Sequence, residues 1–116
     1  MSPAQRSLKK LRSEGALVGV TERWNPHARR RHDLYGFLDL VAVEPGKPGC
    51  LGIQTTSGDH VAHRLAKLAG DEAVAANMRQ WLAAGNRLVI HGWKKRGAAG
   101  ARKLWTCREV LVESVP

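Results

Sequence analysis

Asp39 has the setting that most directly suggests chemistry in this chain of 116 residues. It lies inside the apolar run Phe37–Val43 (Phe-Leu-Asp-Leu-Val-Ala-Val). An unpaired carboxylate buried in such a run would cost several kcal/mol. The side chain therefore needs a hydrogen-bond partner, a cation or a metal ion, which another part of the chain must help to provide.

Gln54 is the partner that hairpin geometry predicts for Asp39. The segment Glu44–Gly49 carries two prolines and two glycines and predicts a turn that leads into a returning strand, Cys50–Thr56. If this turn is symmetric, Asp39 lies directly opposite Gln54, at the distance at which cross-strand side chains interact. Thr56, two residues further on, points to the same face of the sheet as Gln54. One polar patch then interrupts an otherwise apolar hairpin.

Two interpretations of this patch remain open. The first is a structural Asp–Gln–Thr cluster whose hydrogen bonds satisfy one another. The second is an oxygen-rich metal site, because a carboxylate, a carbonyl oxygen and water are the ligands that suit Mg²⁺. A Mg²⁺ ion polarises a phosphate and activates water, so a site of this kind beside a basic surface indicates phosphodiester cleavage.

The charge of the chain indicates a polyanionic partner. Lys and Arg number 19 against 10 acidic residues, which gives a net charge of +9 and a pI of about 10.4. Most basic residues fall in two segments, 6–31 and 94–108, and Trp24, Trp93 and Trp105 flank them, where they could stack on bases. The alternative is two solvated segments that only keep the protein in solution. The predicted contacts with a nucleic-acid backbone are Arg23, Arg29, Arg30, Arg31, Lys94, Lys95 and Arg96.

The elements that must position these residues alternate between helix and strand. Ser2-Pro3 predicts a helix start and Gly15 its end. We expect strands at Ala16–Arg23, Phe37–Val43, Cys50–Thr56, Arg87–Trp93 and Lys103–Val112, helices from Asp59 to Gly70 and from Asp71 to Gly85, and loops at Trp24–Arg31, as a loop or ribbon end, and at Lys94–Ala101. The first three strands should form an antiparallel meander, and the helical crossover permits a parallel return. The prediction is one α/β domain over residues 1–116, with a mixed sheet flanked by helices.

Two runs of this sequence resemble the core of the PD-(D/E)xK nuclease superfamily. They are 36–43 (Gly-Phe-Leu-Asp-Leu-Val-Ala-Val) and 51–56 (Leu-Gly-Ile-Gln-Thr-Thr). Segments 22–26 and 31–37 are similar to small members of its Holliday-junction-resolvase-like branch. The resemblance covers roughly residues 3–93 and implies a restriction-endonuclease-like αβββαβ core, the order of elements expected above.

The resemblance also implies roles for individual residues. Asp39 matches the metal-binding aspartate of the motif, and Gln54 stands at its (D/E) position. Thr56 stands where the catalytic lysine would be, and this is a departure from the motif. Lys67 and Arg64, on the following helix, are the nearest candidates to replace that lysine.

Two acidic residues upstream extend the implied metal site. Glu22 could supply the additional acidic ligand that several branches of the superfamily place before the motif, and Asp33 is a further candidate. The alternative for both is simple ion pairing with Arg23 or with Arg29–Arg31. The implied metal ligands are therefore Asp39, Gln54 and Glu22, and the implied catalytic set adds Thr56.

The resulting expectation is a Mg²⁺- or Mn²⁺-dependent deoxyribonuclease whose partner is DNA. Superfamily nucleases often act as dimers, so a homodimer is also possible. One alternative is a catalytically inactive nucleic-acid-binding module of the same fold. Another is a small interaction or structural subunit whose basic surface serves solubility alone.

Composition excludes several other classes of protein. The apolar runs are far too short to span a bilayer, and the first residues carry no apolar signal segment. The two cysteines, Cys50 and Cys107, do not form a disulfide framework, so we expect a reducing, cytoplasmic location. The five histidines have no spacing that selects zinc.

Overall fold

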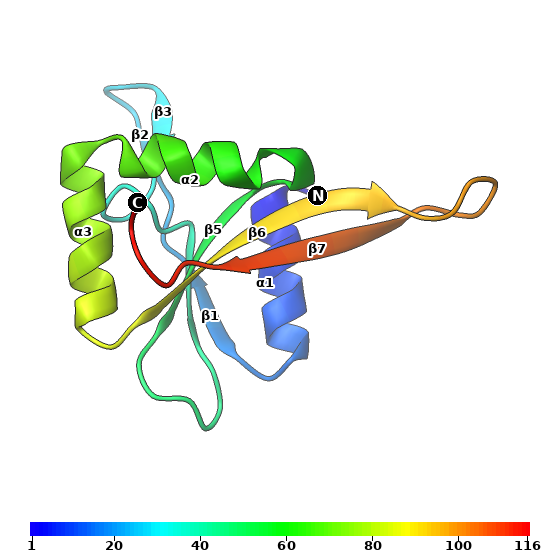
Figure 1. Cartoon of the computed structure of the whole chain (residues 1–116), viewed down its shortest axis with the longest axis horizontal. Helices are drawn as coiled ribbons and strands as arrows, with labels where there is room; N and C mark the ends of the chain where they lie inside the picture. The colour runs from blue at the N-terminus through cyan, green and yellow to red at the C-terminus, as the bar shows by residue number, and fades with distance from the viewer.

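Five strands form one mixed sheet in the computed structural model, which describes all of residues 1–116 (Figure 1). In spatial order the strands are β1 (Leu17–Val20), β4 (Leu40–Val43), β5 (Leu51–Ser57), β6 (Arg87–Arg96) and β7 (Leu104–Leu111). Every neighbouring pair is antiparallel except β5 and β6, which run parallel. The predicted antiparallel meander followed by a parallel return is confirmed.

Helices cover both faces of this sheet. Leu8 and Leu11 of α1 (Pro3–Ser13) pack in one core with Val89 of β6. The neighbouring residues Leu88 and Ile90 point to the opposite face. There they pack in a second core with residues of α2 (Val61–Ala69) and α3 (Glu72–Ala83). The chain is thus a compact α/β fold, and none of its helices has the length and hydropathy that a membrane span requires.

Two of the three predicted helix starts are confirmed by their caps, and the third helix begins two residues later than predicted, at Val61, without a side-chain cap. Ser2 precedes α1, and its Oγ accepts a hydrogen bond from the Gln5 backbone N–H at 3.2 Å. Asp71 precedes α3, and its Oδ1 accepts from the N–H groups of Ala73 and Val74. A single 3₁₀ turn, η1 (Gly58–His60), leads into α2.

The register between β4 and β5 is the symmetric one. Leu40 pairs with Ile53, and the next two pairs follow without a slip. Asp39 lies just before the paired residues, and its N–H donates to the Ile53 carbonyl at 3.0 Å. Gln54 Nε2 donates to Asp39 Oδ2 at 2.6 Å, so the predicted contact between these two side chains is confirmed.

The predicted strand Ala16–Arg23 is wrong beyond Val20. The chain leaves the sheet there and forms a separate two-stranded ribbon from β2 (Arg23–Asn25) and β3 (Arg30–His32). Asn25 Oδ1 accepts hydrogen bonds from two backbone N–H groups in the connecting turn. The polar segment 24–31 therefore pairs with itself, as a local ribbon with no apolar face to bury against the sheet.

The predicted strand Phe37–Val43 is correct only from Leu40 onward. Phe37 and Leu38 are fully buried, yet they belong to a tight turn in which the Leu38 N–H donates to the Leu34 carbonyl at 3.1 Å. Tyr35 and Gly36 have positive φ values of 56° and 84° in this turn. An apolar run indicates that side chains are buried, but it does not specify the backbone. Here Phe37 and Leu38 are buried in the core from a turn and not from a strand.

The predicted loop Lys94–Ala101 is also wrong in its first part. Strand β6 continues through Lys94 and Lys95 to Arg96, which pairs with Leu104 of β7. The two strands extend past the rest of the chain as a long hairpin (Figure 1). Only residues 97–103 remain as its loop.

Candidate active site

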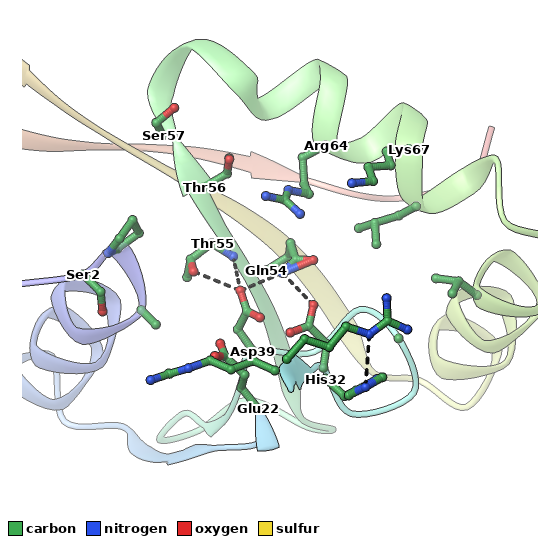
Figure 2. A pocket seen from close by; sticks show the side chains of 18 of the residues that line it. Ser2, Glu22, His32, Asp39, Gln54, Thr55, Thr56, Ser57, Arg64 and Lys67 are labelled. Carbon is green, nitrogen blue, oxygen red and sulfur yellow. Dashed lines mark hydrogen bonds and ion pairs between the residues drawn. The ribbon is translucent and has the colours of Figure 1, made fainter. Parts of the chain in front are cut away.

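A polar cavity of about 720 Å³ opens at the end of the sheet where β4 begins and β5 ends. Its walls come from the start of α1, the β2–β3 ribbon, β5 and α2 (Figure 2). Only three of its 19 lining residues are hydrophobic, so the cavity suits a charged or polar ligand.

Asp39 is fixed at the floor of this cavity by three hydrogen bonds to its Oδ2. The donors are Gln54 Nε2 at 2.6 Å, the Thr55 backbone N–H at 2.8 Å and Thr55 Oγ1 at 2.9 Å. The chain before Asp39 turns away from β5, so no backbone carbonyl meets the Thr55 N–H. The Asp39 carboxylate takes the place of that carbonyl. All three of these hydrogen bonds end on Oδ2, and none of them uses the other oxygen, Oδ1.

Gln54 joins Asp39 to a second carboxylate. Its Nε2 also donates to Asp33 Oδ2 at 3.3 Å, so one amide group lies between two acids. Its Oε1 is buried without any hydrogen-bond partner. A buried polar atom with no partner is rare in proteins and marks a place where a ligand can bind.

Three carboxylates meet at this point. Oxygens of Glu22, Asp33 and Asp39 all lie within 4.8 Å of one another. Burial, followed by the hydrogen bond and the charge of Asp39, raises the pKa of Asp33 from 3.8 to about 8. Glu22 raises this pKa further, and the Arg64 guanidinium opposes the rise. The fold thus places close together carboxyl groups that would repel one another if all were ionised, an arrangement typical of functional sites.

These residues fit a hard divalent cation. The three carboxylates form an all-oxygen donor set of the kind that Mg²⁺ and Mn²⁺ prefer. Gln54 adds a carbonyl oxygen on the same side chain that contacts Asp33 and Asp39. A cation would also remove the repulsion that raises the Asp33 pKa.

Basic side chains surround the acids. Arg30 and Arg31 of the ribbon line the cavity from one side, and Arg64 and Lys67 of α2 line it from another. Figure 2 shows Arg64 and Lys67 projecting from their helix toward the carboxylates. Arg31 is the only one paired with a cavity acid, Glu22, at 3.0 Å. The cavity therefore combines a cluster of anions with cations that can bind a phosphate.

Thr56 lines the cavity on β5, but it does not contact Asp39. Its neighbour Thr55 makes those contacts, and the sequence reasoning missed it. The alternation of side chains along a strand assigns residue 56 to the face of Gln54, whereas Thr55 reaches Asp39 through its backbone N–H and its hydroxyl. The sequence offers no signal for this contact, because the apolar residues Phe37 and Leu38 before Asp39 predict that the strand and its ladder continue there.

The other predicted site residues are divided between the cavity and the surface. Glu22 lies in the acidic cluster, and so does Asp33, which the sequence indicated only as a further candidate. Arg23 and Arg29 lie on the β2–β3 segment but do not line the cavity. The remaining predicted contacts, Lys94, Lys95 and Arg96, lie on the projecting hairpin, away from the cavity lining.

A second set of possible metal ligands lies on the α1 face of the sheet. His91, Cys107 and Glu109 offer ligand atoms within 4.8 Å of one another. Lys10 Nζ is 3.0 Å from Glu109 Oε1, so a cation already balances this carboxylate. Burial also raises the pKa of the Cys107 thiol to about 12, which disfavours the thiolate that a metal would bind.

Comparisons with protein-family models, with curated proteins and with solved structures found no match to this chain.

Proposed function

We propose that this protein is a divalent-cation-dependent deoxyribonuclease with a restriction-endonuclease-like αβββαβ core. The observation that carries the proposal is the cluster of Glu22, Asp33 and Asp39 in a cavity lined by basic side chains. The order helix, antiparallel meander, helix and parallel strand is the arrangement that the PD-(D/E)xK resemblance implies. Asp39 and Gln54, the residues that match the motif, are joined by a hydrogen bond of 2.6 Å, and this contact supports the resemblance.

The residues of the cavity divide the work between cation and substrate. Asp39, Asp33 and Glu22 would hold Mg²⁺ or Mn²⁺, with Gln54 beside them. A cation bound there supplies a Lewis acid for the phosphoryl oxygen and lowers the pKa of water. Arg64 and Lys67 neutralise the charge that develops on the phosphate during hydrolysis. They thereby take the role of the lysine that the motif has at the position of Thr56.

DNA is the proposed substrate because the protein combines a cavity for one phosphate with basic side chains around and beyond it. The net charge of +9 attracts a polyanion at long range. Arg30 and Arg31 continue the basic lining of the cavity onto the β2–β3 ribbon, where Trp24 is 61% exposed. A strand of nucleic acid that crosses the cavity would meet phosphate contacts and a stacking surface in succession.

The proposal is tested by cleavage of labelled duplex, single-stranded and four-way-junction DNA in Mg²⁺, Mn²⁺ or EDTA. We expect cleavage only with the cation, and its loss in Asp39→Asn. Glu113→Gln, which removes an exposed carboxylate outside the cavity, is the matched control and should cleave like the wild type. Cleavage that persists in EDTA, or in purified Asp39→Asn, would show that the acidic cluster is not the catalytic centre.

The presence of Thr56 supports a second candidate function, a nucleic-acid-binding module without catalysis. Strand β5 offers no cationic side chain at that position. The same experiment separates the two candidates, because the inactive module would bind DNA with a steep salt dependence and leave it uncut in every cation. Absence of both binding and cleavage would leave an interaction or structural subunit.

A further inference from the structure

The projecting hairpin of β6 and β7 has a feature that core packing does not explain. We call residues 94–106 the arm. Every residue from Lys95 to Thr106 is exposed, so the pairing of the two strands there buries no side chain in the core. Figure 1 shows the arm extending beyond all other elements. A hydrogen-bonded ribbon that contributes nothing to the core calls for a role outside it.

The arm carries positive charge without local compensation. Five of its residues are basic, and no acidic residue occurs between 94 and 108. Only Lys94, at the base, has a carboxylate partner, Asp59 at 2.8 Å. The other basic residues of the arm, namely Lys95, Arg96, Arg102 and Lys103, form no ion pair.

The base of the arm is held on both faces. On the α1 face the Arg6 guanidinium lies over the Trp105 ring at 3.7 Å, and Lys95 Nζ is 5.6 Å from the same ring. On the other face Lys94 is tied to Asp59 of η1. The arm therefore presents its charges from a fixed ribbon, and less conformational entropy is lost when it binds.

We propose that the arm binds the phosphate backbone of duplex DNA outside the cavity, so that the substrate carries a double-stranded segment beside the scissile phosphate. This inference rests on the proposed nuclease function. A two-stranded β-ribbon matches the width of the major groove of B-DNA, about 12 Å, and Lys and Arg supply its backbone contacts. Single-strand binding instead needs free aromatic faces, and Arg6 covers a face of Trp105.

The test measures DNA binding in EDTA, where cleavage does not interfere. The arm variant is Arg96→Glu/Arg102→Glu/Lys103→Glu. The control is Arg12→Glu/Lys47→Glu/Arg79→Glu, three exposed basic positions outside the arm and the cavity. Both variants reduce the net charge by six, from +9 to +3, so their total charge is matched. The control also removes the Lys47–Glu44 ion pair and the hydrogen bond from Arg12 to the Val18 carbonyl, so thermal unfolding checks that both variants are folded. The probes are a fluorescent 30-base-pair duplex and a single strand of the same length, read by anisotropy over a series of salt concentrations.

We expect the arm variant to bind the duplex about 10- to 100-fold more weakly, with a log–log salt slope smaller by about 2 to 3. The control should lose less than about threefold, because its charges act only at long range. On the single strand the arm variant should stay within about threefold of the wild type. Arg102→Glu alone repeats the comparison should the triple variant fail to fold.

Equal losses in the arm variant and the control would overturn the inference, because net charge alone would then explain binding. Equal losses on duplex and single strand would overturn the assignment to duplex DNA. Duplex binding that is indifferent to the arm, together with selective loss of binding to anionic phospholipid vesicles, would assign the arm to a membrane surface. This binding assay needs no cation, so it is independent of the cleavage assay. Either proposal, DNA binding by the arm or cleavage in the cavity, can therefore be refuted while the other holds.

Discussion

Replacing Asp33 by asparagine should stabilise the cation-free protein at pH 8, and by clearly less at pH 5. The pKa of Asp33 is about 8 in the folded protein, against an ordinary value of 3.8. Between these values the folded state retains a proton that the unfolded chain releases. The contribution of this proton is complete below pH 3.8 and is lost as the pH rises toward 8. Asparagine is neutral throughout and avoids this loss.

The size of the effect follows from the surroundings of Asp33. Between pH 3.8 and pH 8, proton linkage can change the free energy of unfolding by at most about 1.4 kcal/mol for each pH unit. The carboxyl group faces an open cavity, and Arg64 offsets part of the repulsion from Asp39 and Glu22, so solvent screening reduces that figure strongly. We expect a gain of about 1–2 kcal/mol at pH 8. In a domain of this length that gain raises Tm by about 4–8 °C.

Thermal unfolding in EDTA at half-unit steps from pH 4.5 to 8.5 measures the difference between variant and wild type. The difference should be smallest at pH 4.5 and grow steadily toward pH 8. Addition of Mg²⁺ or Mn²⁺ at pH 8 should then raise the Tm of the wild type more than that of Asp33→Asn, because the variant lacks one of the ligands.

Asp59→Asn is the control with the opposite sign. Its hydrogen bond with Lys94 lowers the pKa of Asp59, so its contribution is present above the ordinary value and is lost as the pH falls. This variant should therefore lose stability relative to the wild type toward high pH. A constant Tm difference for Asp33→Asn across the whole pH range, or a less stable variant at pH 8, would refute the reasoning about the acidic cluster.

Three further substitutions test the site and the fold. Thr56→Lys places a cation where the nuclease motif has its lysine and should raise the rate of metal-dependent cleavage; an unchanged rate in folded protein would show that this lysine is not what limits activity. Gly36→Ala puts a methyl group 2.6 Å from Val74 Cγ2 at a φ of 84°, and urea denaturation should show a loss of about 2–3 kcal/mol; a loss near zero would mean that the turn relaxes easily. Ser2→Ala removes the cap of α1 and should cost about 1 kcal/mol in the same assay; an unchanged midpoint would contradict the capping role of Ser2.

Local signals in the sequence predicted most of the elements. Ser2-Pro3 and Asp71 mark helix starts because a cap acts on N–H groups two or three residues away. The turn Glu44–Gly49 determined the register of its hairpin, because a short turn leaves few ways to pair its flanking residues. These features depend on neighbours in the sequence, so the sequence reveals them.

The errors arise where distant contacts decide the structure. Phe37 and Leu38 read as a strand, yet the core accepts them from a turn, because burial requires an apolar side chain and not a particular backbone. Strand β6 extends to Arg96 because it pairs with β7 there, and the basic sequence of residues 94–96 does not predict this pairing. Thr55 contacts Asp39 because the preceding chain turns away from β5.

The sequence by itself determined that Asp39 needs a partner, that Gln54 supplies it, and that the chain carries a large positive charge. These conclusions follow from the cost of burying a charge, from the register of the hairpin and from the numbers of basic and acidic residues. Only the tertiary structure decided that Glu22 and Asp33 join Asp39 and that Arg64 lines the same cavity. The β2–β3 ribbon and helix α2 bring these residues together, and the packing of such separate segments has no local signature in the sequence.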